Sequence, residues 1–181
     1  MPRINPVELA TADTGVQATL GAVKAKIGMV PNLYATFAQA PAVLNGNLGF
    51  ADSLGSGVLT AAQRAIVALA VAQYNGCHYC LSAHTLMGKG AGLSPEAIRA
   101  ARLGKGQDPL DDAIATLALR IVETRGHVTD SDLSAARLAG LDDARIVEIV
   151  GNVAHNVLTN FMNNVAQTKI DFPVVDVAVA A

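Results

Sequence analysis

Residues 75 to 84 read Asn75-Gly76-Cys77-His78-Tyr79-Cys80-Leu81-Ser82-Ala83-His84. The stretch contains the only two cysteines of the chain, three positions apart, and a histidine four positions after the second. A helix turns by about 100° per residue, so Cys77, Cys80 and His84 would lie within about 60° on one helix face. Two thiols and an imidazole on one face can form a disulfide, favour a thiolate or bind a metal ion.

The dipeptide Asn75-Gly76 predicts a break, followed by a helix that begins close to Cys77 and runs to about Gly88. Cys77 would then lie in the first helical turn, where unpaired backbone N–H groups and the helix dipole favour a thiolate.

Three other interpretations of the cysteine pair stay open. Buried thiols can be inert, and Cys-x-x-Cys is half of a zinc knuckle. A zinc site would still need a fourth protein ligand, and the remaining histidines, His127 and His155, are distant in the sequence. A structural disulfide across three residues closes too small a loop to add much stability, and it serves better as a reversible redox pair. The pattern therefore favours a working dithiol.

The composition predicts a single domain whose surface is partly covered by partner subunits. The chain has 181 residues, of which 51% are apolar and 15% are charged, below the ~25% of a typical soluble domain. The formal net charge of −2, without a basic run longer than a pair, argues against nucleic acid and anionic membranes as partners.

The sequence also favours a cytoplasmic, reducing location. The longest apolar run, residues 65–72, is much shorter than the ~20 residues that span a bilayer, and residues 1–6 lack the apolar core of a signal peptide. In a reducing compartment Cys-x-x-Cys is more often catalytic or metal-binding than a structural disulfide.

Nearly every segment has the apolar spacing of a helix, so we expect an all-α, single-domain helical bundle over residues 1–181. Helix 61–73 is apolar on most sides, which places it in the core. The apolar tail 174–180 would dock on a neighbouring subunit or fray. The expected helices are 14–27, 32–39, 41–54, 61–73, 77–88, one that opens at Ser94-Pro95-Glu96, 111–124, one from Thr129 or Asp130 to 138, and one from Asp142 or Asp143 to about 168.

The last expected helix carries Asn152, Asn156, Asn160 and Asn164 at intervals of four residues. Asparagine has a poorer helix propensity than the Lys and Glu of an ordinary exposed face. The row is therefore either a merely polar exposed face or a buried row of amides that binds a neighbouring helix or subunit.

The pattern from Leu59 to Thr85, LTAAQRAIVALAVAQYNGCHYCLSAHT, resembles the core of the alkylhydroperoxidase D and carboxymuconolactone decarboxylase family, and more narrowly its peroxidase-related branch. Further similarity flanks this core, so the resemblance covers almost the whole chain. The flanking segments are residues 28–32, 146–150, 159–164 and 171–173.

The resemblance implies an alkylhydroperoxidase D-like helical domain with its redox core at about residues 59–90, assembled as a trimer or hexamer. It also implies a thiol-dependent peroxidase, an antioxidant enzyme in which Cys80 is peroxidatic, Cys77 is resolving and His84 belongs to the proton relay. A peroxide would be the substrate and a dithiol protein or small thiol the reductant. No metal, haem or flavin cofactor is implied.

One position departs from the family pattern. Members commonly have a glutamate twelve residues before the first cysteine as the base of the relay, and Ala65 stands there in this chain. Two alternatives therefore remain: a carboxymuconolactone decarboxylase-like enzyme, or a catalytically impaired redox sensor on the same fold. Glu123, Glu148 and His155 lie on other expected helices; His155 is a candidate replacement, although a lone histidine is more often structural.

Overall fold

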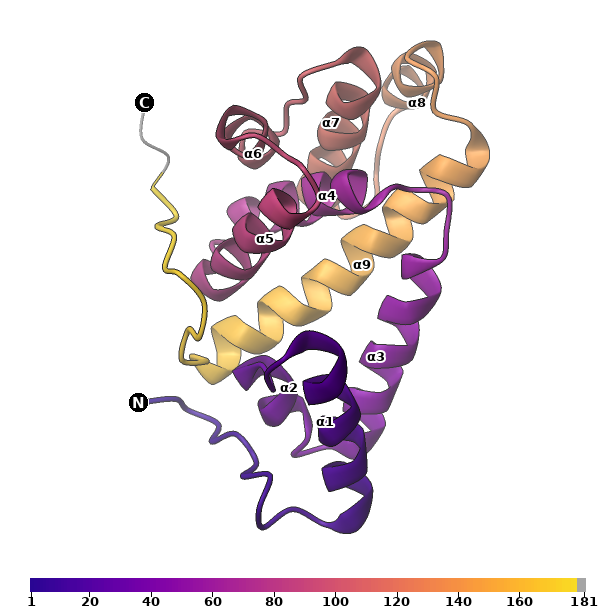
Figure 1. Cartoon of the computed structure of the whole chain (residues 1–181). Helices are drawn as coiled ribbons and strands as arrows, with labels where there is room; N and C mark the ends of the chain where they lie inside the picture. Colours follow the sequence, from indigo (N-terminus) through magenta and orange to yellow (C-terminus); the bar gives the residue numbers. More distant parts are fainter. Residues whose placement is uncertain (179–181) are drawn as a thin grey trace.

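The computed structural model describes residues 1–178 and confirms the all-α fold, because every regular element in that range is a helix (Figure 1). The helices are α1 (Thr14–Ile27), α2 (Asn32–Phe37), α3 (Pro41–Gly55), α4 (Ala61–Tyr74), α5 (His78–Gly90), α6 (Pro95–Arg102), α7 (Pro109–Thr124), α8 (Asp130–Leu138) and α9 (Asp143–Ala166).

Helix starts follow the capping residues. Thr60 and Gln63 form a reciprocal capping box at α4, and Ser94 caps α6. Two starts differ from expectation. Helix α7 begins two residues early, at Pro109, because the side chain of Asp108 accepts hydrogen bonds from the first turn. Cys77 is the N-cap of α5, not a residue of its first turn.

Helix α4 forms the centre of the core, as its all-round apolar sequence predicts. It packs against α5, α6, α7 and α9, and each residue from Ala65 to Ala72 is buried. Helix α9 crosses the molecule diagonally, between this upper group and helices α1 to α3 (Figure 1). The beginning of α5 and one face of α9 therefore meet deep inside the protein.

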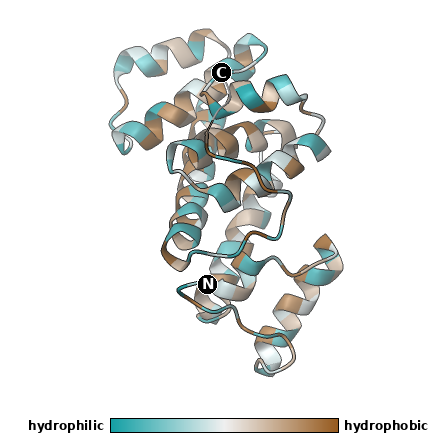
Figure 2. Cartoon of the chain, turned by 90° about the vertical axis from the view of Figure 1, so that its left-hand side faces the viewer, coloured by the Kyte–Doolittle hydropathy of each residue, from teal (hydrophilic) through white to brown (hydrophobic). Residues whose placement is uncertain are grey.

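The C-terminal segment docks on the same chain. The backbone N–H of Val175 donates to Ser82 Oγ over 3.0 Å, and Gln73 Nε2 donates to the carbonyl of Val177 over 2.8 Å. In Figure 2 the segment that ends at the label C passes in front of the helices in the upper part of the molecule. We expected the tail 174–180 to dock on a neighbouring subunit or to fray, but up to residue 178 it packs on its own chain. Positions 179 and 180 lie outside the described residues.

Glu148 of α9 holds the loop that leads into α4. Its carboxylate accepts a hydrogen bond from the backbone N–H of Leu59 over 2.7 Å. A side chain at Gly57 would overlap this carboxylate, so a larger residue there would have to displace Glu148 from the N–H of Leu59. No helix in residues 1–178 is long and apolar enough to cross a membrane.

Candidate active site

The two cysteines meet where α4 turns into α5. Gly76 adopts a left-handed conformation with φ of 61°, which a residue with a side chain rarely takes, and this allows α5 to fold back against α4. The sulfur of Cys77 caps α5 by accepting a hydrogen bond from the backbone N–H of Cys80 over 3.3 Å. The two sulfurs lie 2.6 Å apart, so a disulfide needs only a small movement.

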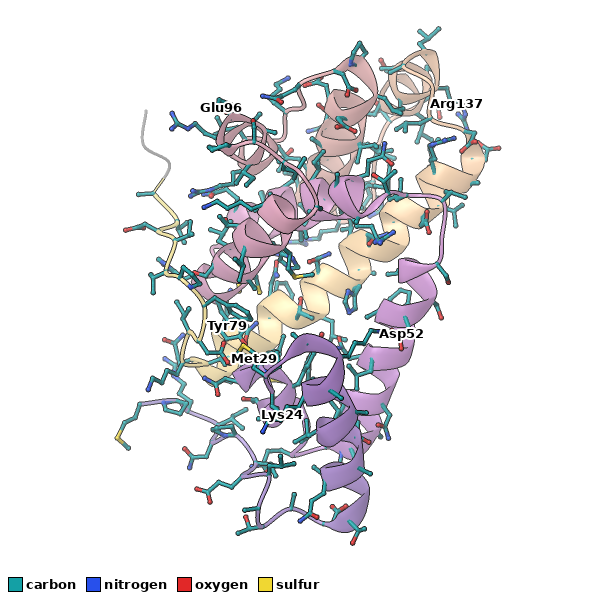
Figure 3. All side chains as sticks on the ribbon, in the orientation of Figure 1. Lys24, Met29, Asp52, Tyr79, Glu96 and Arg137 are labelled. Carbon is teal, nitrogen blue, oxygen red and sulfur yellow. The ribbon has the colours of Figure 1, made fainter. Side chains whose placement is uncertain are left out.

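Both sulfurs are enclosed by protein. Cys77 is 0% exposed and Cys80 is 2% exposed, and both are free thiols. The Tyr79 side chain between them is buried as well; its hydroxyl accepts a hydrogen bond from the N–H of Leu33, and its ring meets Phe172 edge to face at 5.5 Å. Figure 3 labels Tyr79 in this region, where α5, α2 and the C-terminal segment converge.

Helix α9 supplies polar partners to Cys80. Asn163 Nδ2 donates a hydrogen bond to Cys80 Sγ over 3.2 Å. The neighbouring Asn160 is 0% exposed, and its Oδ1 accepts a hydrogen bond from Asn75 Nδ2 over 2.9 Å. Asn164 Nδ2 donates to the carbonyl of Asn75 over 2.9 Å, so the residue before the Gly76 turn is tied to α9 twice.

These contacts make the two thiols unequal. Burial opposes ionisation of Cys80, but hydrogen bonding from Cys77, Asn163 and Asn160 outweighs it and lowers the pKa of Cys80. Hydrogen bonding to Cys80, followed by burial, raises the pKa of Cys77. The expectation of a thiolate at Cys77 is therefore wrong. The start of α5 favours negative charge, but the donors from α9 converge on Cys80.

His84 lies on α5 one turn after Cys80 and is neutral at pH 7. Burial and, to a smaller extent, the charge of the nearby His155 together lower its pKa to about 4, although a hydrogen bond from the ring to Asn156 partly opposes them. A neutral imidazole can accept a proton, whereas an imidazolium can only donate one. The neutral ring of His84 is therefore a proton acceptor, and its part in a relay with Cys80 stays a prediction.

The asparagine row is buried, which decides between the two interpretations of the sequence. Asn152, Asn156 and Asn160 are each at most 4% exposed, so the exposed-face interpretation is wrong. Asn152 and Asn156 donate back to carbonyls of their own helix, at Glu148 and Asn152. The sequence analysis did not predict that Asn163 and Asn160 contribute to the cysteine site. The four-residue spacing of the asparagines was the one sequence feature that pointed to a buried polar face on this helix.

Ala65, where relatives have the relay glutamate, and the three residues considered as replacements for that glutamate lie in different surroundings. Ala65 is buried on α4, and its Cβ would lie 3.7 Å from a Cβ at Gly88, one turn beyond His84. Glu123 forms an ion pair with Arg120 at 3.3 Å, and Glu148 holds the N–H of Leu59. Of the three candidates, His155 is the one whose charge acts on His84.

Across the part of the chain that the structure describes, no three His, Cys, Asp or Glu side chains gather closely enough to hold a metal ion.

The segment that carries this site is similar to a known family. Residues 41–124, which contain both cysteines and His84, match the model of the carboxymuconolactone decarboxylase family. No curated protein sequence matches the chain significantly.

Solved structures share the fold over nearly the whole chain. A peroxidase-related protein with an alkylhydroperoxidase AhpD core from Ralstonia eutropha JMP134 is 25% identical, with a TM-score of 0.85 over 94% of this chain and 92% of the other. A peroxidase-related protein from Silicibacter sp. TM1040 is 21% identical, with a TM-score of 0.78 over 92% and 91%. The debrominase Bmp8, solved with 2,3,4-tribromopyrrole, is 16% identical, with a TM-score of 0.77 over 93% and 91%, which is a likeness of fold alone.

The family match spans the redox core, and the similarity of fold covers 94% of the chain. Residues 41–124 therefore resemble the carboxymuconolactone decarboxylase family, and the fold of nearly the whole chain is similar to that of a peroxidase-related protein with an alkylhydroperoxidase AhpD core.

Proposed function

We propose that this protein is a thiol-dependent peroxidase, an antioxidant enzyme that reduces a peroxide at Cys80 and is reset through a disulfide with Cys77. The observation that carries the proposal is the unequal pair: two sulfurs 2.6 Å apart, of which only Cys80 receives a hydrogen bond from the amide of Asn163. A thiolate is the nucleophile in thiol chemistry, and Cys80 is the sulfur on which negative charge is stabilised.

The reaction follows from the arrangement. The Cys80 thiol gives its proton to the neutral imidazole of His84, and the thiolate attacks one peroxide oxygen. The O–O bond breaks, Cys80 becomes a sulfenic acid, and the leaving oxygen takes the proton as water or an alcohol. The Cys77 thiol then attacks the sulfenic sulfur, so that water leaves and the disulfide forms. Two thiols of an external dithiol reduce this disulfide and become a disulfide themselves.

The surroundings favour a small oxidant. Both sulfurs are almost completely buried, and their polar neighbours from α9 are uncharged amides. A dithiol protein or a small thiol would restore the reduced pair, which accords with a reducing, cytoplasmic location. No metal or organic cofactor takes part in the proposed cycle.

We also propose that the protein acts as a homo-oligomer, a trimer or hexamer, with the outer face of α9 in the interface. Apolar side chains recur along this face with helical spacing and are at least 40% exposed. They are Val147, Val150, Leu158, Phe161 and Val165.

The test is a two-step assay on the reduced protein. Mass spectrometry after hydrogen peroxide should show the loss of two hydrogens, restored by dithiothreitol, and the protein should then consume peroxide catalytically with dithiothreitol present. Thiols that stay free under peroxide would contradict the proposal. A disulfide that forms without turnover would instead favour a redox sensor.

The same assay distinguishes other chemistry on this fold. Because Bmp8 was solved with 2,3,4-tribromopyrrole, this compound is a useful comparison substrate. A dithiol-dependent loss of bromide that is faster than peroxide consumption would overturn the assignment to peroxide. Consumption of neither compound would leave a decarboxylase-like activity as the alternative.

A further inference from the structure

Two buried amide atoms beside Cys80 have no hydrogen-bond partner among the described residues. Asn163 uses its Nδ2 to donate to the sulfur of Cys80 over 3.2 Å, and its Oδ1 is left unpaired. Asn160 uses its Oδ1 to accept from Asn75 Nδ2 over 2.9 Å, and its Nδ2 is left unpaired. Both residues are at most 4% exposed. An unpaired buried polar atom is destabilising, so the two atoms indicate a polar ligand at this place.

Both atoms lie close to the reactive sulfur. The oxygen and the nitrogen of one amide are about 2.3 Å apart, so Asn163 Oδ1 is within about 5.5 Å of Cys80 Sγ. Asn160 lies one turn before Asn163 on the same face of α9. Its amide is close enough to lower the pKa of Cys80, although its Nδ2 completes no hydrogen bond to a described residue. The unpaired oxygen and the unpaired N–H are therefore neighbours of the same thiol.

An acceptor next to a donor matches the polar groups of a hydroperoxide. The terminal oxygen of a hydroperoxide carries a hydrogen that it can donate to an amide oxygen, and the other oxygen has lone pairs that accept from an amide N–H. An anion without a proton would pair with the N–H alone and would leave the Asn163 oxygen unpaired. The two amides carry no net charge to attract an anion, which favours a small neutral ligand.

We propose that Asn163 Oδ1 and Asn160 Nδ2 form the peroxide-binding position of Cys80, where Asn163 accepts from the O–H of the attacked oxygen and Asn160 donates to the leaving oxygen. This inference rests on the proposed peroxidase function and gives its substrate class, a small neutral hydroperoxide.

The reaction at this position balances with the groups already described. The Cys80 thiolate forms an S–O bond to the oxygen that carries the hydrogen, and the O–O bond breaks. Sulfur is oxidised by two electrons to a sulfenic acid, and the peroxide is reduced to water or an alcohol. The leaving oxygen receives the electron pair of the O–O bond and takes the proton that Cys80 released. The Asn160 N–H stabilises the negative charge that develops on this oxygen before the proton arrives.

Two reagents separate peroxide binding from the reactivity of the sulfur itself. Hydrogen peroxide and iodoacetamide both react with the thiolate, so the ratio of their rates at Cys80 does not depend on the amount of thiolate present. Iodide leaves iodoacetamide without needing a hydrogen-bond donor. In Asn160→Ala the ratio of the peroxide rate to the iodoacetamide rate should fall roughly ten-fold or more, since one lost donor to a developing oxyanion costs about 10²–10³ in rate.

Two further variants accompany this measurement. Asn163→Ala should lower the same ratio, because it removes the acceptor for the peroxide O–H. Asn152→Ala is the matched control, because it removes another buried amide of the row on α9, one that donates to the carbonyl of Glu148. Its ratio should equal that of the wild type.

Peroxide binding can also be measured without the reaction, which decides the matter even where Asn160→Ala does not fold. The variant Cys80→Ser keeps both asparagines and has no sulfur at position 80 to oxidise. In NMR spectra of its isotope-labelled side-chain amides, hydrogen peroxide should shift the signals of Asn160 and Asn163 until they saturate, while the signals of Asn152 stay in place. Signals that do not move would mean that the two atoms bind water only.

An unchanged ratio in Asn160→Ala, an equal fall in Asn152→Ala, or amide signals that do not respond to hydrogen peroxide would each overturn the binding position. A wild-type protein whose Cys80 does not react with hydrogen peroxide would contradict the proposed function instead. The amide signals would then still show whether a peroxide binds beside position 80.

Discussion

The side-chain amide of Asn163 donates a hydrogen bond of 3.2 Å to the sulfur of Cys80, although the two residues are 83 positions apart in the chain. The bond joins the middle of the redox motif to the last helix. Its donor approaches one sulfur of the pair, and this asymmetry is the physical basis for assigning the peroxide to Cys80 rather than Cys77.

Replacing Asn163 by alanine should raise the pKa of Cys80 because it removes a donor to the thiolate. A hydrogen bond to a charged group contributes about 1.5–3 kcal/mol, so alkylation by iodoacetamide at pH 7 should slow by roughly ten-fold or more. Measuring the alkylation rate against pH checks this. Asn45→Ala, at an exposed asparagine on α3, is the control, and equal rates in the two variants would refute the role of Asn163.

The two cysteines should give different products with peroxide when each is changed to serine. Cys77→Ser should stop at a sulfenic acid on Cys80, which dimedone traps and mass spectrometry detects. Cys80→Ser should lose peroxide consumption almost entirely, because it removes the sulfur on which Asn163 and Asn160 stabilise negative charge, while burial still raises the pKa of Cys77. A dimedone adduct on Cys77 in the second variant would reverse the assignment of roles.

Introducing a carboxylate at position 65 should accelerate peroxide turnover. Ala65 faces α5 near Gly88, one turn beyond His84, so a glutamate there could orient the imidazole and favour its protonated form. We expect Ala65→Glu to increase turnover at pH 7 and to lower the apparent pKa for reaction at Cys80. Stopped-flow kinetics with hydrogen peroxide measures both.

Folding must be checked first in this variant, because an unpaired buried carboxylate costs several kcal/mol or stays protonated. Ala65→Gln has nearly the same volume without the charge and is the matched control. Normal folding with unchanged or slower turnover would show that the absence of a carboxylate does not limit the enzyme.

Acidification should destabilise the protein through His84. The unfolded chain protonates this ring at its ordinary pKa of 6.5, whereas the folded protein does so at about 4. The stabilising contribution is therefore complete above pH 6.5 and decreases as the pH falls from 6.5 to 4. At 1.4 kcal/mol per pKa unit the loss is on the order of 3 kcal/mol. Urea denaturation at pH 7 and pH 5 should show about 2 kcal/mol of this loss, because pH 5 lies 1.5 units below 6.5. His84→Gln should remove most of the dependence, while His127→Gln should not.

Disrupting the outer face of α9 should dissociate the proposed oligomer. Phe161 is 55% exposed in the single chain, and a glutamate there would place a charge in an apolar interface. Sedimentation should show an oligomer for the wild type and an 18.6 kDa monomer for Phe161→Glu. Leu138→Glu, at a 91% exposed position on α8, should sediment like the wild type, and a monomeric wild type would end the proposal.

Much of the site was visible in the local sequence. The spacing of Cys77, Cys80 and His84 on one helix, and the turn at Gly76, follow from residues within one short segment. The burial of the asparagine row remained undecided from the sequence because a four-residue repeat describes one helix face and does not say what packs against it.

The sequence by itself determined the helices, because capping residues, prolines and apolar spacing act within a few positions along the chain. Only the tertiary structure decided the chemistry of the two sulfurs. The donors to Cys80 come from α9, and the burial that keeps His84 neutral comes from the packing of the surrounding helices. A pKa depends on every charge, donor and apolar neighbour within several ångströms, and these neighbours are brought together by the fold and not by the order of residues.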